Sequence, residues 1–149
     1  MHVTLLLGST SDMDTAEKIF GVLKDFGIKH DVVVASAHKV PEKVIEVVKS
    51  MNADPEPRVI ITIVGMSNGL AGVVAGSSLH PVVNCPPHKS LEEYMTDLHS
   101  SLRMPSEVPV MTVLNPKNAA LAAVKIFALQ DAKLRTKVAE RIEKIKAEY

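Results

Sequence analysis

Short runs of apolar residues alternate along this chain with longer stretches in which apolar positions recur every three or four residues. A short apolar run bounded by glycine, proline or polar residues is typical of a strand buried on both faces. Such runs occur at residues 3–7, 30–35, 59–64, 81–83 and 110–113. The pattern therefore predicts five short strands.

The stretches between the runs predict helices. The first helix can be capped by Ser11 or Asp12, and Gly27 is placed to end it. Pro41 opens a second helix, because proline suits the first helical turn. Further helices are expected over 69–76, from the Asn-Pro pair at 115–116 to about 129, and over 131–149, whose apolar stripe opposes many charged residues. Residues 88–109 receive no assignment.

This order of elements predicts the fold class. Parallel neighbouring strands need crossover connections, and the crossover helices cover both faces of the sheet. We therefore expect an α/β protein, a three-layer α/β/α sandwich with a five-stranded parallel sheet of flavodoxin-like type. At 149 residues the chain fits a single domain, 1–149, with an amphipathic C-terminal helix at about 131–149.

Composition narrows the range of partners. Seventeen basic and seventeen acidic residues cancel, so we expect neither nucleic acid nor an anionic membrane as a partner. Cys85 is the only cysteine, and we expect its thiol to be buried and structural. The apolar start is too short for a signal peptide or a membrane span, so we expect a cytoplasmic protein. No metal is expected, because no metal-ligand spacing occurs among the remaining histidines, most of which we expect at the surface: His2, His30, His80, His88 and His99.

Small and polar residues follow the first three strands, at the edge of the sheet where this fold class binds ligands. The loop Gly8 to Asp12 lies at a helix start, where backbone amides carry partial positive charge and suit a phosphate, and Ser9 and Ser11 add hydroxyl donors. Asp12 would repel a phosphate, so it either accepts hydrogen bonds from sugar hydroxyls or caps the helix. The loop is not a Walker loop, and no Gly-x-Gly-x-x-Gly motif occurs, which disfavours nucleoside triphosphates and dinucleotides.

The other two loops add a titratable side chain and close backbone approach. In Ser36-Ala37-His38-Lys39 the imidazole can exchange a proton near neutral pH, and the ammonium can bind phosphate as a point charge. In the loop Gly65 to Gly72 the small residues let the backbone approach a ligand, and Ser67 and Asn68 add polar groups. The same small residues would also suit tight packing of a helix on the sheet.

In order and spacing, these segments resemble PurE proteins of purine biosynthesis. The matching segments are Gly-Ser-Thr-Ser-Asp at 8–12, Ser-Ala-His-Lys at 36–39, Gly-Met-Ser-Asn-Gly-Leu at 65–70, Asn-Cys-Pro-Pro at 84–87, Ser-Ser-Leu-Arg-Met-Pro-Ser at 100–106 and Thr-Val-Leu at 112–114. The resemblance covers nearly the whole chain up to residue 129. It implies a homo-oligomer, a tetramer or an octamer, for which the C-terminal helix would suit subunit contacts.

Two positions indicate one branch of that family. The mutase branch typically has arginine where this chain has Lys39, and a second histidine where it has Gly69. The chain therefore resembles the class II branch, which carboxylates 5-aminoimidazole ribonucleotide with carbon dioxide and uses no cofactor: no ATP, biotin or metal. The alternative is the mutase reaction of N5-carboxyaminoimidazole ribonucleotide on the same scaffold. A receiver-like signalling module is disfavoured, because it needs acidic residues where this chain has Gly-Ser-Thr and Gly-Met-Ser.

The resemblance also implies roles for individual residues. His38 would be the catalytic base that removes the ring proton, and Asp12 would bind the ribose hydroxyls. The phosphate would be held by Ser9, Ser11, Ser36 and Lys39 with the backbone at Gly8. The base and carbon dioxide would contact the loop that contains Ser67, Asn68, Gly69 and Gly72. Arg103 would contribute to the site, either that of its own subunit or that of a neighbour.

Overall fold

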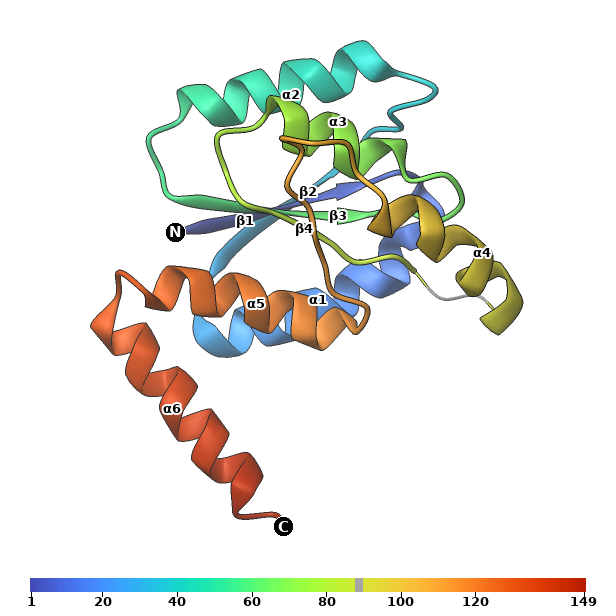
Figure 1. The fold of residues 1–149 in the computed structure, drawn as a ribbon. Helices are drawn as coiled ribbons and strands as arrows, with labels where there is room; N and C mark the ends of the chain where they lie inside the picture. The colour runs from blue at the N-terminus through green and yellow to red at the C-terminus, as the bar shows by residue number, and fades with distance from the viewer. Residues whose placement is uncertain (88–89) are drawn as a thin grey trace.

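The computed structural model describes residues 1–87 and 90–149, and its helices lie on both faces of a central sheet (Figure 1). His88 lies outside the described residues. The strands are β1 (His2–Leu7), β2 (Lys29–Val34), β3 (Arg58–Ile63), β4 (Val82–Asn84) and β5 (Met111–Thr112). The helices are α1 (Met13–Phe26), α2 (Pro41–Ala53), α3 (Gly69–Ser77), α4 (Leu91–Leu102), α5 (Pro116–Ala128) and α6 (Ala132–Lys146), and the short 3₁₀ helix η1 (Thr10–Asp12) precedes α1.

All strand pairs in the sheet are parallel, and the strand order is β2-β1-β3-β4-β5. This order is that of flavodoxin-like folds, in which the chain changes direction across the sheet between β1 and β3. The predicted three-layer fold is confirmed. The loops after β1 and β3 start side by side, because Leu7 pairs with Ile63 at the ends of these strands.

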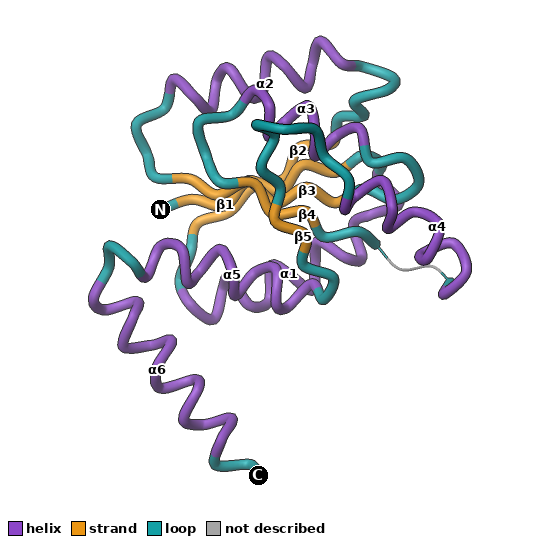
Figure 2. The backbone as a smooth tube through the Cα atoms, viewed as in Figure 1, coloured by secondary structure: helices purple, strands orange, loops and turns teal. Residues whose placement is uncertain are grey.

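The alternation of side chains along the strands produces two cores. Leu5 and Leu7 of β1 point to the face covered by α1 and α5, whereas Leu6 points to the face covered by α2 and α3. All three side chains are fully buried. Figure 2 shows the strands between these two helical layers. Central strands buried on both faces have nearly continuous apolar runs, which is why the sequence pattern located β1 and β3. Strand β2 differs from the prediction, because it lies at the edge of the sheet and its residues are exposed or half-buried.

Several predicted boundaries are also confirmed. Gly27 ends α1 in the left-handed conformation, with φ of 70°, and Pro41 is the first residue of α2. Asn115 caps α5 by accepting hydrogen bonds from two backbone amides. Asp12, one of the two predicted caps, occupies the N-cap position of α1, but its side chain makes no capping hydrogen bond to this helix.

Two further differences concern the second half of the chain. The fifth strand has two residues rather than four, since only the middle of the predicted run 110–113 pairs with β4. Helix α4 was not predicted, although Ser90 caps it by accepting a hydrogen bond from the backbone N–H of Glu93. Its apolar residues Leu91, Met95, Leu98 and Leu102 recur at helical spacing, but Leu91, Met95 and Leu102 are exposed, so this stripe does not pack into the core.

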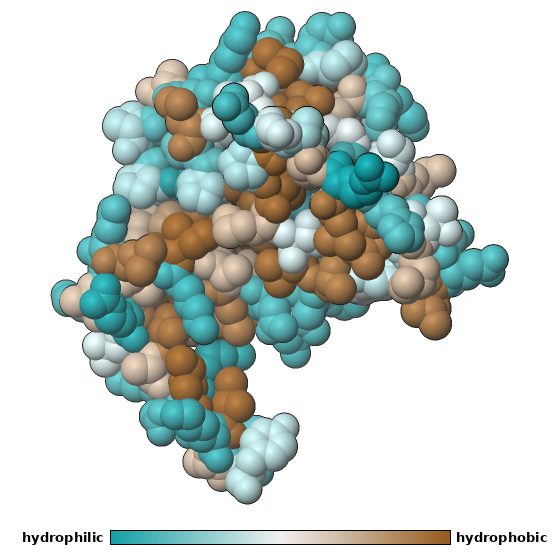
Figure 3. Space-filling model, viewed as in Figure 1, coloured by the Kyte–Doolittle hydropathy of each residue, from teal (hydrophilic) through white to brown (hydrophobic). Residues whose placement is uncertain are grey.

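The predicted C-terminal helix projects from the body (Figure 1). It is attached at its first turn, where Leu134 is buried and the Arg135 guanidinium donates hydrogen bonds to the carbonyls of residues 128 and 129. Further along α6, Ile142 and Ile145 are exposed, and Figure 3 shows apolar surface along this helix. Among the described residues, no helix has the length and apolar character needed to cross a membrane.

Candidate active site

The three loops predicted to carry the chemistry open onto one cavity of about 690 Å³ at the carboxyl edge of the sheet. A cavity of this size fits a nucleotide-sized ligand. Of the residues predicted for the site, those that line it are Gly8, Ser9, Ser11, Asp12, Ser36, His38, Lys39 and Ser67. The fold thus brings together side chains from three loops that are more than 20 residues apart in sequence.

The first loop begins at Gly8, which lies beside Val64. A Cβ atom on Gly8 would lie 2.8 Å from Cγ2 of Val64, so only glycine fits here without a shift of the neighbouring strand end. Beyond it, Ser9 and Asp12 form a capping box around η1: the Asp12 carboxylate accepts the Ser9 N–H at 3.0 Å, and Ser9 Oγ accepts the Ser11 N–H at 3.2 Å. The Asp12 side chain therefore has a structural role in the loop while it also lines the cavity.

The second loop carries the imidazole and the ammonium. A backbone hydrogen bond of 2.9 Å from Val40 N–H to the Ser36 carbonyl closes a tight turn, and His38 and Lys39 project from it as exposed side chains. The His38 ring lies directly over Gly69, the first residue of α3. A Cβ on Gly69 would be 2.8 Å from His38 Nε2 and 3.0 Å from Cε1. Glycine at position 69 is what lets the ring occupy this place.

The third loop is attached to α4. Met66 has a left-handed backbone, with φ of 58°, and its N–H donates a 2.6 Å hydrogen bond to Oδ2 of Asp97. Two residues further on, the Asn68 N–H donates to Ser100 Oγ at 3.0 Å. The Asn68 side chain caps α3 through the N–H of Ala71 and also donates to Ser101 Oγ.

Four predicted site residues do not line the cavity, and one of them is Gly69, which lies beneath the His38 ring. Asn68 is buried, and its side-chain bonds are those just described. Gly72 lies on α3, where a Cβ would approach Sδ of Met104 at 3.5 Å, so its near contact is with the segment after α4 and not with the sheet. Arg103 is exposed at the C-terminal end of α4.

Sequence reasoning missed one wall of the cavity. Helix α4 contributes Glu93, Tyr94 and Asp97, and the segment before it contributes Pro87. Glu93 and Asp97 are four residues apart and so lie on one face of the helix. That spacing was the available signal, but without a predicted helix at 91–102 it could not be interpreted.

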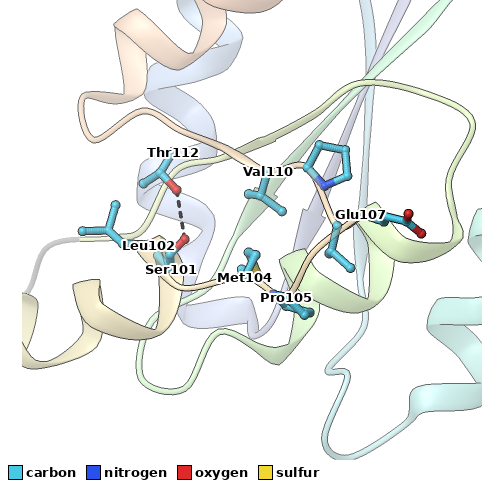
Figure 4. A pocket seen from close by; sticks show the side chains of 9 residues that line it. Ser101, Leu102, Met104, Pro105, Glu107, Val110 and Thr112 are labelled. Atoms are coloured by element: carbon cyan, nitrogen blue, oxygen red, sulfur yellow. Dashed lines mark hydrogen bonds between the residues drawn. The ribbon is translucent and has the colours of Figure 1, made fainter.

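A second cavity, of about 590 Å³, lies beside the loop that follows α4 (Figure 4). Leu102, Met104 and Val110 are among its lining residues, and among the described residues that line it only Glu107 is charged. Thr112 Oγ1 donates a hydrogen bond of 3.2 Å to the Ser101 carbonyl at its edge. We place the candidate active site in the first cavity, because that cavity holds the polar and titratable groups.

Two titratable groups near the site have perturbed pKa values. Burial raises the pKa of the Cys85 thiol to about 12, so the thiol stays protonated and does not act as a nucleophile at neutral pH. This agrees with the predicted structural thiol. Burial, and secondly the charge of a Cys85 thiolate, raise the pKa of the Tyr94 phenol above its ordinary value of 10.0, so Tyr94 is a neutral side chain of the cavity wall. No cluster of His, Cys, Asp and Glu among the described residues could hold a metal ion.

A flavodoxin-like sheet with a phosphate-suited loop, a histidine and a lysine at one edge defines a protein that binds a phosphorylated small molecule and can move a proton on it. Comparison with known proteins agrees with this class. The family model described as AIR carboxylase matches residues 2–148. The chain belongs to this family, as its resemblance to PurE proteins predicted.

Individual relatives are also close. A protein of Archaeoglobus fulgidus named phosphoribosylaminoimidazole carboxylase is 44% identical over 94% of this chain and 76% of its own length. A Methanocaldococcus jannaschii protein named N5-carboxyaminoimidazole ribonucleotide mutase is 41% identical over 97% of this chain and 90% of its own. The crystal structure of Treponema denticola PurE covers 99% of this chain and 92% of its own, with a TM-score of 0.94 and 42% identity.

Proposed function

We propose that this protein carboxylates 5-aminoimidazole ribonucleotide with carbon dioxide, giving 4-carboxy-5-aminoimidazole ribonucleotide in purine biosynthesis. The observation that carries the proposal is that His38 shares one cavity with the Gly8 to Asp12 loop. The loop supplies backbone amides for a phosphate, and the imidazole stands where it can reach a heterocycle anchored by that phosphate.

The reaction suits these residues, because the substrate itself provides the nucleophile. Its amino group pushes electron density onto the adjacent ring carbon, which forms a bond to carbon dioxide. That carbon then bears both the new carboxylate and its original hydrogen. His38 removes the hydrogen as a proton, and the electron pair of the C–H bond restores the aromatic ring. In the reverse direction the protonated imidazole returns the proton before carbon dioxide leaves.

The remaining residues bind and orient the substrate. We assign the phosphate to Ser9, Ser11, Ser36 and Lys39, and the ribose hydroxyls to Asp12, which lines the same cavity. Ser67 and the start of α3 face the base and carbon dioxide. This chemistry needs no ATP, biotin or metal, so turnover in EDTA without ATP should equal turnover in plain buffer.

The histidine assignment has a direct test. His38→Asn removes the base but keeps a polar side chain on the turn, and we expect kcat to fall about 10²–10⁴-fold with little change in KM. His99→Asn is a matched control, because His99 is exposed on α4 and does not line the cavity. If kcat of the His38 variant stays within a few-fold of the parent, another group is the base.

The mutase reaction is the second candidate, since the Methanocaldococcus jannaschii relative carries that name. The two reactions differ in the carboxyl donor. Purified protein should convert 5-aminoimidazole ribonucleotide in the presence of carbon dioxide and should not convert the N5-carboxy compound. Turnover of the N5-carboxy compound alone would assign the mutase reaction instead.

We also propose that the protein forms a homo-oligomer, a tetramer or an octamer, in the cytoplasm. The exposed Ile142 and Ile145 on the projecting α6 support subunit contacts through this helix. Light scattering coupled to gel filtration measures the assembly, and a monomer at micromolar concentration would contradict it. The buried, reduced Cys85 is compatible with a reducing compartment.

A further inference from the structure

Helix α4 is hydrogen-bonded to the third loop at Met66 and at Asn68, the residues on either side of Ser67. The Asp97 carboxylate accepts the Met66 N–H at 2.6 Å, and Ser100 Oγ accepts the Asn68 N–H at 3.0 Å. Ser100 Oγ also lies 2.8 Å from the Asp97 carbonyl and 3.1 Å from the Met66 carbonyl, and these two oxygens share its one proton. The residues that precede and follow Ser67 are therefore both hydrogen-bonded to α4.

Met66 shows why the loop needs this attachment. Its φ of 58° lies in the left-handed region, which is unfavourable for a residue with a Cβ, and its side chain is 80% exposed, so packing does not hold it there. A hydrogen bond to a carboxylate is stronger than one between neutral groups. The bond from the Met66 N–H to Asp97 stabilises a backbone conformation that is unfavourable for methionine without this bond.

The conformation of the loop affects the position of the His38 ring through Gly69. Gly69 follows directly after the attached residues, its N–H donates to the Ser67 carbonyl at 3.0 Å, and the imidazole lies on its Cα. If the loop changed conformation, Ser67 would move, and so would Gly69, against which the imidazole lies. The sequence separation of 31 residues between Met66 and Asp97 makes this a tertiary link between the two walls of the cavity.

We propose that Asp97 is a positioning residue: through its hydrogen bond to the Met66 N–H, it holds the loop from Gly65 to Gly69 in the conformation that seats His38 for proton transfer. This inference rests on the proposed carboxylase function for its kinetic part only. The attachment of the loop is a property of the structure and can be measured without substrate.

The test compares Asp97→Ala, Asp97→Asn and Glu92→Ala in the full-length protein. Asparagine keeps an oxygen acceptor for the Met66 N–H, whereas alanine removes it. Glu92 is an exposed acid of the same helix and does not line the cavity, so its variant controls for lost charge on α4. Hydrogen exchange measured by mass spectrometry reports on residues 65–70, steady-state kinetics give kcat and KM, and thermal melting reports on the whole fold.

For Asp97→Ala we expect exchange in 65–70 to accelerate at least about tenfold while the core strands keep the parent rate. We expect kcat to fall about 10- to 100-fold with KM within about threefold, because the misplacement affects proton transfer more than substrate binding. The asparagine variant should restore both values to within about threefold of the parent, and the Glu92 variant should match the parent.

Three results would overturn the proposal. Parent-like exchange in Asp97→Ala would show that the bond does not hold the loop. Faster exchange with unchanged kcat would show that the loop does not seat the histidine, and equal loss in the alanine and asparagine variants would assign the effect to charge. If the parent itself does not carboxylate aminoimidazole ribonucleotide, the proposed function fails, while the exchange data still decide whether Asp97 holds the loop.

Discussion

The contact between His38 and Gly69 allows a single methyl group to test the geometry of the site. In Gly69→Ala the new Cβ would lie 2.8 Å from Nε2 and 3.0 Å from Cε1, whereas ordinary contacts begin at 3.4 Å. The ring must therefore move by about 0.6 Å or more, and a displacement near 1 Å of a reacting group can lower the rate about 100-fold. We expect kcat to fall about 10- to 100-fold.

Stability should change little in this variant. The His38 side chain is exposed on a turn, so it can move without disturbing the core, and alanine is a better helix former than glycine at the start of α3. We expect the melting temperature to stay within about 2 °C of the parent, which corresponds to less than about 1 kcal/mol for a chain of this size. A loss of activity without a loss of stability is the signature of a displaced catalytic group.

Gly21→Ala is the matched control. Gly21 is exposed within α1, and a Cβ there would meet no atom within 4 Å. This variant should gain about 0.5–1 kcal/mol of stability and keep the parent kcat. The assay follows formation of the carboxylated ribonucleotide at saturating substrate, with melting measured on the same samples. Parent-like kcat in Gly69→Ala would refute the reasoning, because it would mean that the ring position seen here is not the catalytic one.

Three further outcomes follow from burial and charge. The Cys85 thiol, whose pKa burial raises to about 12, should stay unmodified by a thiol reagent at about pH 8, and one thiol per chain should react after denaturation; modification in the native protein would contradict its burial. The backbone N–H of Glu56 and then the Arg58 guanidinium hold the pKa of Asp54 below its ordinary value of 3.8, so the stability that they contribute is complete above that value and is lost as pH falls through the lower folded pKa. Asp54→Asn should therefore lower the melting temperature at neutral pH but not at a pH below about 2, and an equal decrease at both would rule out the linkage. Leu5→Ala, at a fully buried position, should cost about 2–5 kcal/mol in chemical denaturation, and a cost near zero would place Leu5 outside the core.

Much of this architecture is encoded locally. All six residues of β3 are buried, and its Val59, Ile60 and Ile61 appear in the sequence as an apolar run. Gly27, Pro41 and Asn115 act through their own backbone or their nearest neighbours, and each begins or ends its helix as predicted. The parallel order then requires the loops after β1, β2 and β3 to meet at one edge, which is why His38 could be assigned to a cavity from sequence.

The other wall of the cavity depends on distant contacts. Helix α4 has an amphipathic pattern, but Leu91, Met95 and Leu102 of its apolar stripe are exposed, so the pattern does not indicate what the helix covers. Asp97 acquires its significance only because the fold brings it to the N–H of Met66, 31 residues away. Likewise, Asn68 and Gly72 were predicted to bind a ligand, yet the Asn68 side chain donates to Ser101 of α4 and Gly72 lies near Met104 in the segment that follows α4.

The sequence by itself thus determined the sheet, the helices that cover it and the three loops that carry the polar groups, because these follow from burial and from backbone preferences within a few residues. Only the tertiary structure decided which loop residues face the cavity, that α4 closes its side, and that the His38 ring rests on Gly69. These features arise from contacts between segments that are distant in sequence, and the local pattern of one segment does not indicate which other segment it contacts.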